Sequence, residues 1–202
     1  MDRLTALFRP VERYANALSP QTHGVVALVS FCTFVGVIVF GFVPVAGRIE
    51  ASGYSTADLQ NATTRAEVDT ILQAFAPVMD SVMLLSALDY LFIVAGLGLF
   101  VSLHSLALNA LTHHDRLALV PKVGTLLTVC SRLLDSVENL LVILIYTNPD
   151  DYATALIGLM NASETAKWAF VSVEYPTLGL AVVLALLVRF TSLFDDPRES
   201  PR

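Results

Sequence analysis

The chain has 202 residues, 55% of them hydrophobic and 15% charged, and its formal net charge is −6. Soluble domains usually carry about 25% charged residues, so this composition predicts an integral membrane protein. The acidic balance gives no reason to expect a nucleic-acid partner, and two cysteines are too few for a disulfide framework or a zinc site.

Residues 1–20 place apolar side chains at helical spacing, with arginines among polar neighbours. This pattern predicts a helix in the cytoplasmic interface of the membrane, where arginine side chains meet anionic lipid. We expect Pro10 to kink or divide that helix, because proline lacks the N–H that an inner turn needs.

Four mostly apolar stretches follow, at about residues 24–45, 82–108, 123–146 and 167–190. Each holds about 20 or more residues, the length that crosses ~30 Å of hydrocarbon as a helix. The first lacks a small-residue cleavage site, so we expect it to be retained rather than removed as a signal peptide. The pattern predicts an all-α bundle of four transmembrane helices, a single membrane domain over residues 1–202 with a flexible tail at 191–202.

Lysine and arginine are unevenly divided between the connections that flank these stretches. The N-terminal segment, the 109–122 loop and the tail carry eight of them, whereas the connections on the other side carry three. Because cytoplasmic loops are enriched in these residues, we expect a multi-pass protein of the cell membrane with both termini in the cytoplasm. Lys167 and Trp168 are expected to anchor the fourth stretch at the outer interface.

Two outer connections carry helical signals of their own. Residues 46–80 are too many for a bare loop, and Thr64 and Glu67 form a capping box before an apolar stripe, which predicts a short amphipathic helix over about 64–76. In the second connection, Asn148 as cap and Pro149 at the first helical position predict another over about 149–160.

The third stretch is unusually polar for a membrane helix. At about 100° per residue, its polar side chains fall within an arc of about 120°, opposite Leu, Val and Ile. Its three ionisable groups cost roughly 7–10 kcal/mol on insertion scales, against a return of about 4–8 from its Leu, Ile and Val residues, so this helix needs polar partners. The stripe consists of Thr128, Ser131, Arg132, Asp135, Glu138, Asn139 and Tyr146.

Two other helices offer such partners at the same depth. Counted from the outer boundary at ~1.5 Å per residue, Asp89 lies about 12 Å deep, Glu174 about 10 Å, and Asp135 and Glu138 about 12 and 8 Å. Arg132 lies about one turn deeper. Four ionised acids and one arginine would leave a charge of about −3, so we expect some protons or a bound cation there.

The expected site comprises the four acids with Arg132 and Asn139. Ser86, which shares a helix face with Asp89, Tyr90, which follows Asp89, and Ser131 are expected to support it. No cofactor is predicted apart from the cation, and no metal site is indicated, because the histidines near the cytoplasmic end lie some 20 Å away.

Asp89-Tyr90-Leu91-Phe92-Ile93 and Leu134-Asp135-Ser136-Val137-Glu138-Asn139 resemble two motifs of an uncharacterised group of prokaryotic four-helix integral membrane proteins. Those proteins carry Asp-aromatic-Leu-Phe-Ile in helix two and Asp-x-x-Glu-Asn in helix three. The resemblance covers about residues 55–150. It implies the same layout and the importance of the two aspartates, Glu138 and Asn139, and it implies no chemistry.

Three functions fit these features. The first is a binding or transport module whose outward-side cluster holds a cation, protons or an amine-bearing solute. The second is an intramembrane enzyme acting on a lipid or isoprenoid, with Asp135 and Glu138 as acid and base or as metal ligands. The third is a structural subunit, in a homo-oligomer or with a membrane partner, whose stripe only fixes helix packing. We expect the first, because no nucleophile–base pair or HExxH motif occurs.

Overall fold

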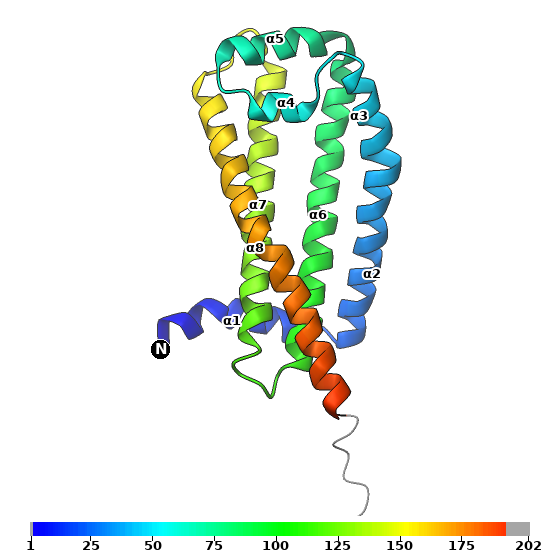
Figure 1. Ribbon diagram of the computed structural model, residues 1–202, viewed down its shortest axis with the longest axis vertical. Coiled ribbons are helices and arrows are strands. Elements are labelled where there is room, and N and C mark those ends of the chain that lie inside the picture. Colours follow the sequence, from blue (N-terminus) through cyan, green and yellow to red (C-terminus); the bar gives the residue numbers. More distant parts are fainter. Residues whose placement is uncertain (1, 193–202) are drawn as a thin grey trace, which may run out of the picture.

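The computed structural model describes residues 2–192, and these residues are helical with no strand. Long helical rods run along the molecule, and shorter helices cross its two ends (Figure 1). The elements are α1 (Asp2–Ala17), α2 (Pro20–Gly36), the π-helical turn η1 (Val37–Phe42), α3 (Val43–Glu50), α4 (Thr56–Asn61), α5 (Arg65–Phe75), the 3₁₀ turn η2 (Ala76–Val78), α6 (Met79–Ala110), α7 (Leu119–Thr147) and α8 (Ala155–Ser192).

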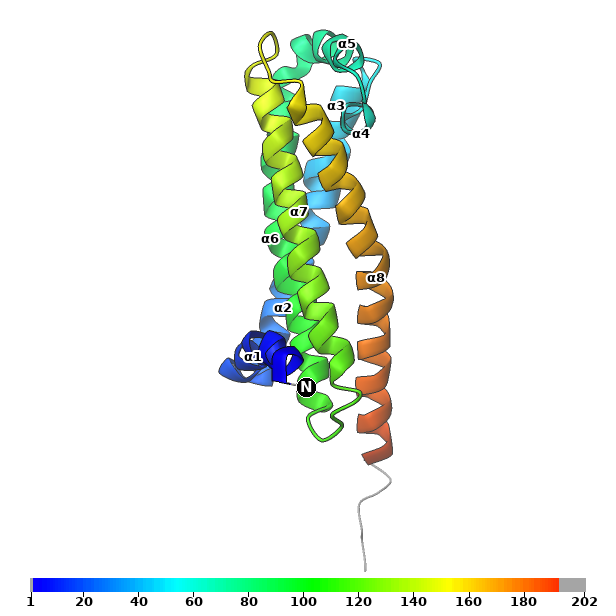
Figure 2. The same ribbon diagram turned by 90° about the vertical axis from the view of Figure 1, so that its left-hand side faces the viewer.

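The long rods are α2 with its continuation through η1 and α3, then α6, α7 and α8. They pack around α6, which contacts α2, α7 and α8, and α7 also packs along α8. Helix α1 lies across one end, where the described part of α8 also finishes, and α4 and α5 lie across the other (Figures 1 and 2). These are called the α1 end and the α4 end below. Both termini of the described chain are therefore at the same end of the bundle.

Within residues 2–192, three helical segments are long and apolar enough to cross a membrane: Pro20–Glu50, Arg65–Ala110 and Ala155–Thr191. They contain three of the four predicted stretches. Helix α7 contains the remaining one, at 123–146, and is also long, with 29 residues. Its charged residues Arg132, Asp135 and Glu138 distinguish it from the other three.

The first apolar stretch extends further than predicted and contains a π-helical turn. Ser19 caps its start and Pro20 occupies the first turn, which suits proline. At η1 the Val43 N–H bonds the carbonyl of Ile38, five residues earlier. The turn ends two residues before Pro44, whose missing N–H and bulky ring would disturb a regular α-helix. The helix then runs on to Glu50.

The N-terminal helix is a single helix, and Pro10 does not divide it. Pro10 is on the exposed side, so solvent or headgroups can satisfy the backbone carbonyl that a proline leaves free. Val11 and Ala15 are buried against α6 and α7, and Glu12 pairs with Lys122 at 2.6 Å. The amphipathic pattern thus packs one face of α1 onto the bundle.

The short helix predicted over 64–76 is present as α5, with the expected capping box between Thr64 and Glu67. Its apolar face, including Val68 and Phe75, is buried in a core with residues of α7 and α8. The shorter α4 was not predicted, although Ser55 and Asp58 form a capping box at its start. Together the two helices cover one end of the bundle.

The prediction of a separate helix over 149–160 is wrong. Asn148 ends α7 instead of starting a new helix, and the Asp151 N–H bonds its carbonyl in a turn. Helix α8 begins at Ala155 and continues through the predicted fourth stretch, because no residue between 155 and 167 interrupts it. Tyr152, Ile157 and Met160 are buried, and Leu156 is partly buried. Beyond Ser192, the predicted tail lies outside the described residues.

Candidate functional site

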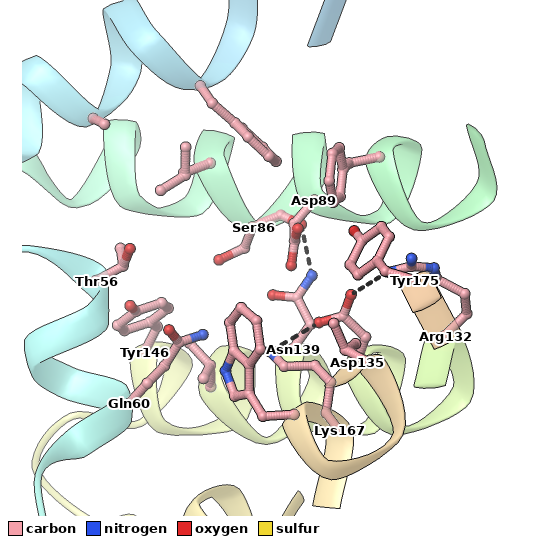
Figure 3. Close-up of a pocket in the computed structure, with 17 residues that line it drawn as sticks. Thr56, Gln60, Ser86, Asp89, Arg132, Asp135, Asn139, Tyr146, Lys167 and Tyr175 are labelled. Atoms are coloured by element: carbon pink, nitrogen blue, oxygen red, sulfur yellow. Dashed lines mark hydrogen bonds and ion pairs between the residues drawn. The ribbon is translucent and has the colours of Figure 1, made fainter. Parts of the chain in front are cut away.

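A pocket of about 420 Å³ lies between the rods near the α4 end. Its walls come from η1, α3, α6, α7 and α8, and residues of α4 also line it (Figure 3). Five aromatic side chains contribute to the wall: Phe42, Phe92, Tyr146, Trp168 and Tyr175. The polar lining comes from Thr56, Gln60, Ser86, Asp89, Arg132, Asp135, Asn139 and Lys167.

The polar stripe of α7 faces the interior, as predicted. All seven of its residues are buried, whereas Leu133, Val137, Leu140 and Leu144 on the same helix are exposed. The helix therefore turns its charged face toward α6 and α8 and its apolar face outward. This is the inverse of a helix at the surface of a soluble protein.

Lys167 belongs to the cluster, and its predicted role as an interface anchor is wrong. Its ammonium nitrogen lies 3.1 Å from Asp135 Oδ1 and 2.5 Å from Glu138 Oε2, and its side chain is 13% exposed. Only Trp168, the other half of the predicted anchor, is exposed. Helical spacing signals this position, since Lys167 lies two turns before the predicted site residue Glu174 on one face of α8.

Glu174 is fully buried and contacts the part of the α7 stripe that lies nearer to the α1 end. It accepts hydrogen bonds from Ser131 Oγ at 2.6 Å and from Arg132 Nη2 at 3.4 Å. Arg132 also lies 3.8 Å from Asp135 and over the ring of Phe100. A Cβ on Gly96 would come 3.3 Å from Arg132 Nε, so the glycine leaves room for the guanidinium.

Two hydrogen bonds join Glu138 and Asn139 to other helices. Gln60 of α4 donates to Glu138 Oε1 at 2.6 Å, a contact across 78 positions that the sequence did not indicate. Asn139 Nδ2 donates to the Ser86 carbonyl of α6 at 3.1 Å. Tyr90 lies beside the cluster instead of in the pocket wall, and its hydroxyl donates to the Ser136 carbonyl at 3.2 Å.

Asp89 differs from the other three acids. It lines the pocket from α6, opposite Asp135 and Asn139 (Figure 3), but makes no hydrogen bond or ion pair within the described residues. Two further polar groups of the pocket wall lack a hydrogen-bond partner there, the Tyr146 hydroxyl and Arg132 Nε. Both side chains are more than nine-tenths buried, so bulk solvent does not provide a hydrogen-bond partner for either group.

The charge balance differs from the one that the sequence predicted. Lys167 joins Arg132 as a second cation, so four ionised acids would leave a charge of −2 instead of about −3. Three of these acids contact a cation, and the uncompensated carboxylate in the pocket is Asp89. Within residues 2–192, no three His, Cys, Asp or Glu side chains are placed to hold a metal ion together.

The site therefore combines a free carboxylate, unpartnered hydrogen-bonding groups and an aromatic wall in one cavity. Its volume lies in the range of about 300–1,000 Å³ that is usual for small-molecule sites. Comparison of the chain with protein-family models, with curated proteins and with solved structures finds no match, so the resemblance in the two motifs stays a prediction.

Proposed function

We propose that this chain is an integral membrane protein in which α7 is a fourth spanning helix beside the three apolar segments. The support comes from which side chains of α7 face the neighbouring helices and which face outward. Its charges meet α6 and α8, and its exposed side chains are Leu and Val. A helix can carry ionisable groups through lipid when they face the bundle interior and pair there. The α4 end is then the outer end, with both termini in the cytoplasm.

Impermeant thiol labelling in intact cells tests this orientation. Cys32 and Cys130 are first replaced by alanine, and single cysteines are then introduced at Ala57 in α4 and at Thr112 in the loop at the α1 end. We expect Ala57→Cys to react in intact cells and Thr112→Cys to react only after the membrane is opened. The reverse pattern would overturn the proposed orientation, and reaction of both in intact cells would overturn the spanning arrangement.

We further propose that the pocket binds a small solute bearing one positive charge, as a binding or transport module. The observation that carries this proposal is the uncompensated carboxylate of Asp89. An ammonium group would compensate Asp89 and would bring the charge of the cluster from −2 to −1 with all four acids ionised. The aromatic rings of the pocket wall offer it cation–π contacts, worth about 0.5–2 kcal/mol each. The Tyr146 hydroxyl provides a hydrogen-bonding group for another part of the solute.

The alternatives explain Asp89 less well. If polar groups only fixed helix packing, each would be expected to contact a neighbouring helix, as Glu138, Asn139 and Glu174 do. Asp89 has no such contact. An enzyme acting through Asp135 and Glu138 needs these carboxylates free, but Lys167 holds both in ion pairs.

Trp168 provides a direct test, because it is the single tryptophan of the chain and lines the pocket. The purified protein in nanodiscs is titrated with butylammonium, with tetramethylammonium and with sodium while tryptophan emission is followed. We expect saturable changes with at least one organic cation, and an affinity at least about tenfold lower in Asp89→Asn, which corresponds to about 1.4 kcal/mol.

The control is Asp115→Asn, in the loop at the α1 end. It should bind like the wild type. If Asp89→Asn binds the organic cations as well as the wild type does, or if no organic cation binds the wild type, the proposed function is wrong.

A further inference from the structure

The pocket is lined on one side by η1 and α3 and on the other by α8, two walls that do not pack along one another. Phe42 and Ala46 belong to the first wall, and Trp168 and Tyr175 to the second. Each wall packs on α6, and α8 also packs on α7. Helices α3 and α8 do not pack against each other as these pairs do. In Figure 1 they lie on opposite sides of α6 below α4.

Two aromatic side chains of the pocket wall also reach the outer surface of the bundle. Trp168 is 59% exposed and Tyr175 is 48% exposed. They lie two turns apart on α8. In the spanning arrangement proposed above, this surface faces acyl chains, so the pocket wall continues into a face that contacts lipid.

The α4 end of the pocket is covered instead. Thr56 and Gln60 of α4 line it, and Gln60 is hydrogen-bonded to Glu138 at 2.6 Å. Between them in the sequence, Leu59 is fully buried in the apolar core that also contains residues of α5, α7 and α8, and it packs α4 onto the bundle. A solute arriving from water meets α4, whereas one dissolved in the bilayer meets the exposed pocket-wall residues Trp168 and Tyr175.

From this arrangement we propose that the ligand is an amphiphile with a single cationic head, such as a long-chain primary amine, which enters sideways from the bilayer. This inference rests on the proposed function. The ammonium group binds Asp89, the first part of the alkyl chain lies among Phe42, Phe92 and Trp168, and the rest extends between α3 and α8 into lipid. Burying the head beside its carboxylate while leaving the tail in hydrocarbon avoids desolvating an ion without a partner.

The test uses amines of two lengths and the emission of Trp168. Nanodiscs containing the full chain receive butylamine, dodecylamine, or dodecylamine with a brominated tail, whose bromines quench tryptophan on contact. Dodecanol with the same brominated tail controls for simple partitioning into the bilayer. We expect dodecylamine to bind at least about tenfold more tightly than butylamine, and the brominated amine to quench more than the brominated alcohol.

Two variants separate this inference from the proposed function. Ala46→Phe places a bulky ring between the walls and should weaken dodecylamine at least about tenfold more than it weakens butylamine. Asp89→Asn should remove the excess quenching by the brominated amine over the alcohol.

If butylamine binds but dodecylamine binds no better, or if Ala46→Phe weakens both amines equally, sideways entry is wrong and the proposed function stands. If neither amine binds the wild type, sideways entry is wrong, and the proposed function fails with it when tetramethylammonium does not bind either.

Discussion

The ammonium nitrogen of Lys167 lies 3.1 Å from a carboxylate oxygen of Asp135, on the neighbouring helix. The same nitrogen contacts Glu138, so one lysine of α8 compensates two acids of α7. In a low-dielectric interior, an acid that loses such a partner keeps its desolvation cost without the compensating attraction. This ion-pair cluster therefore couples the position of α8 to the polar stripe.

Lys167→Met should lower stability by about 3–5 kcal/mol, the usual cost of leaving buried charge without its partner. Thermal or denaturant unfolding of the detergent-solubilised protein measures the change. The matched control is Lys122→Met, which breaks the Lys122–Glu12 pair at the α1 end, where the side chains are more exposed. We expect about 0–1 kcal/mol there, and similar losses in the two variants would contradict a special role for Lys167.

Gly124 of α7 lies against the buried imidazole of His104 on α6. A Cβ at residue 124 would overlap that ring, whereas one at Gly179 in α8 would meet nothing within 4 Å. Gly124→Ala should therefore destabilise the protein by about 1–3 kcal/mol, because the ring has no open space to enter. Gly179→Ala should be neutral or stabilising by up to about 1 kcal/mol, since alanine favours a helix. Unfolding midpoints of the two variants decide the matter, and equal midpoints would disprove the close packing.

The Gln60–Glu138 hydrogen bond fastens α4 over the pocket. Gln60→Ala should raise hydrogen–deuterium exchange in residues 56–61, because the helix loses its polar contact with the bundle interior. Asn61→Ala is the matched control, since the Asn61 side chain is exposed and bonds only the carbonyl of Ala57 within α4. If exchange in α4 rises equally in both variants, the bond to Glu138 does not hold the helix in place.

The cap of α4 should respond to acid. Backbone and side-chain hydrogen bonds from Ser55 lower the pKa of Asp58 below its usual 3.8. Because the folded-state pKa is the lower one, the carboxylate adds stability above pH 3.8, and this contribution disappears as the pH falls through the folded-state pKa.

The difference in melting temperature between the wild type and Asp58→Asn should therefore be larger at pH 7 than below about pH 3. Asp151→Asn, at an exposed position without a side-chain hydrogen bond in the described chain, should change the melting temperature little at pH 7. A difference for Asp58→Asn that does not change with pH would contradict the charged cap.

The sequence by itself determined the long helices, α5 and the direction of the α7 stripe. The long helices follow from the length of the apolar stretches, and the polar residues of α7 share one arc, so a single rotation buries them all. The capping box at Thr64 and Glu67 is equally local, and α5 begins where it predicts. At Asn148 and Pro149, the sequence alone did not show that Asn148 would end α7 instead of starting a new helix.

Only the tertiary structure decided which charges are compensated. Lys167 and Gln60 reach Glu138 from segments 29 and 78 positions away, and each contact depends on how α8 and α4 pack. Within the described residues, the same packing leaves Asp89 without a hydrogen-bond or ion-pair partner, although its predicted depth matches that of the paired acids. Pairing of ions is a long-range property, set by distances of a few ångströms between helices, and helical periodicity contains no information about those distances.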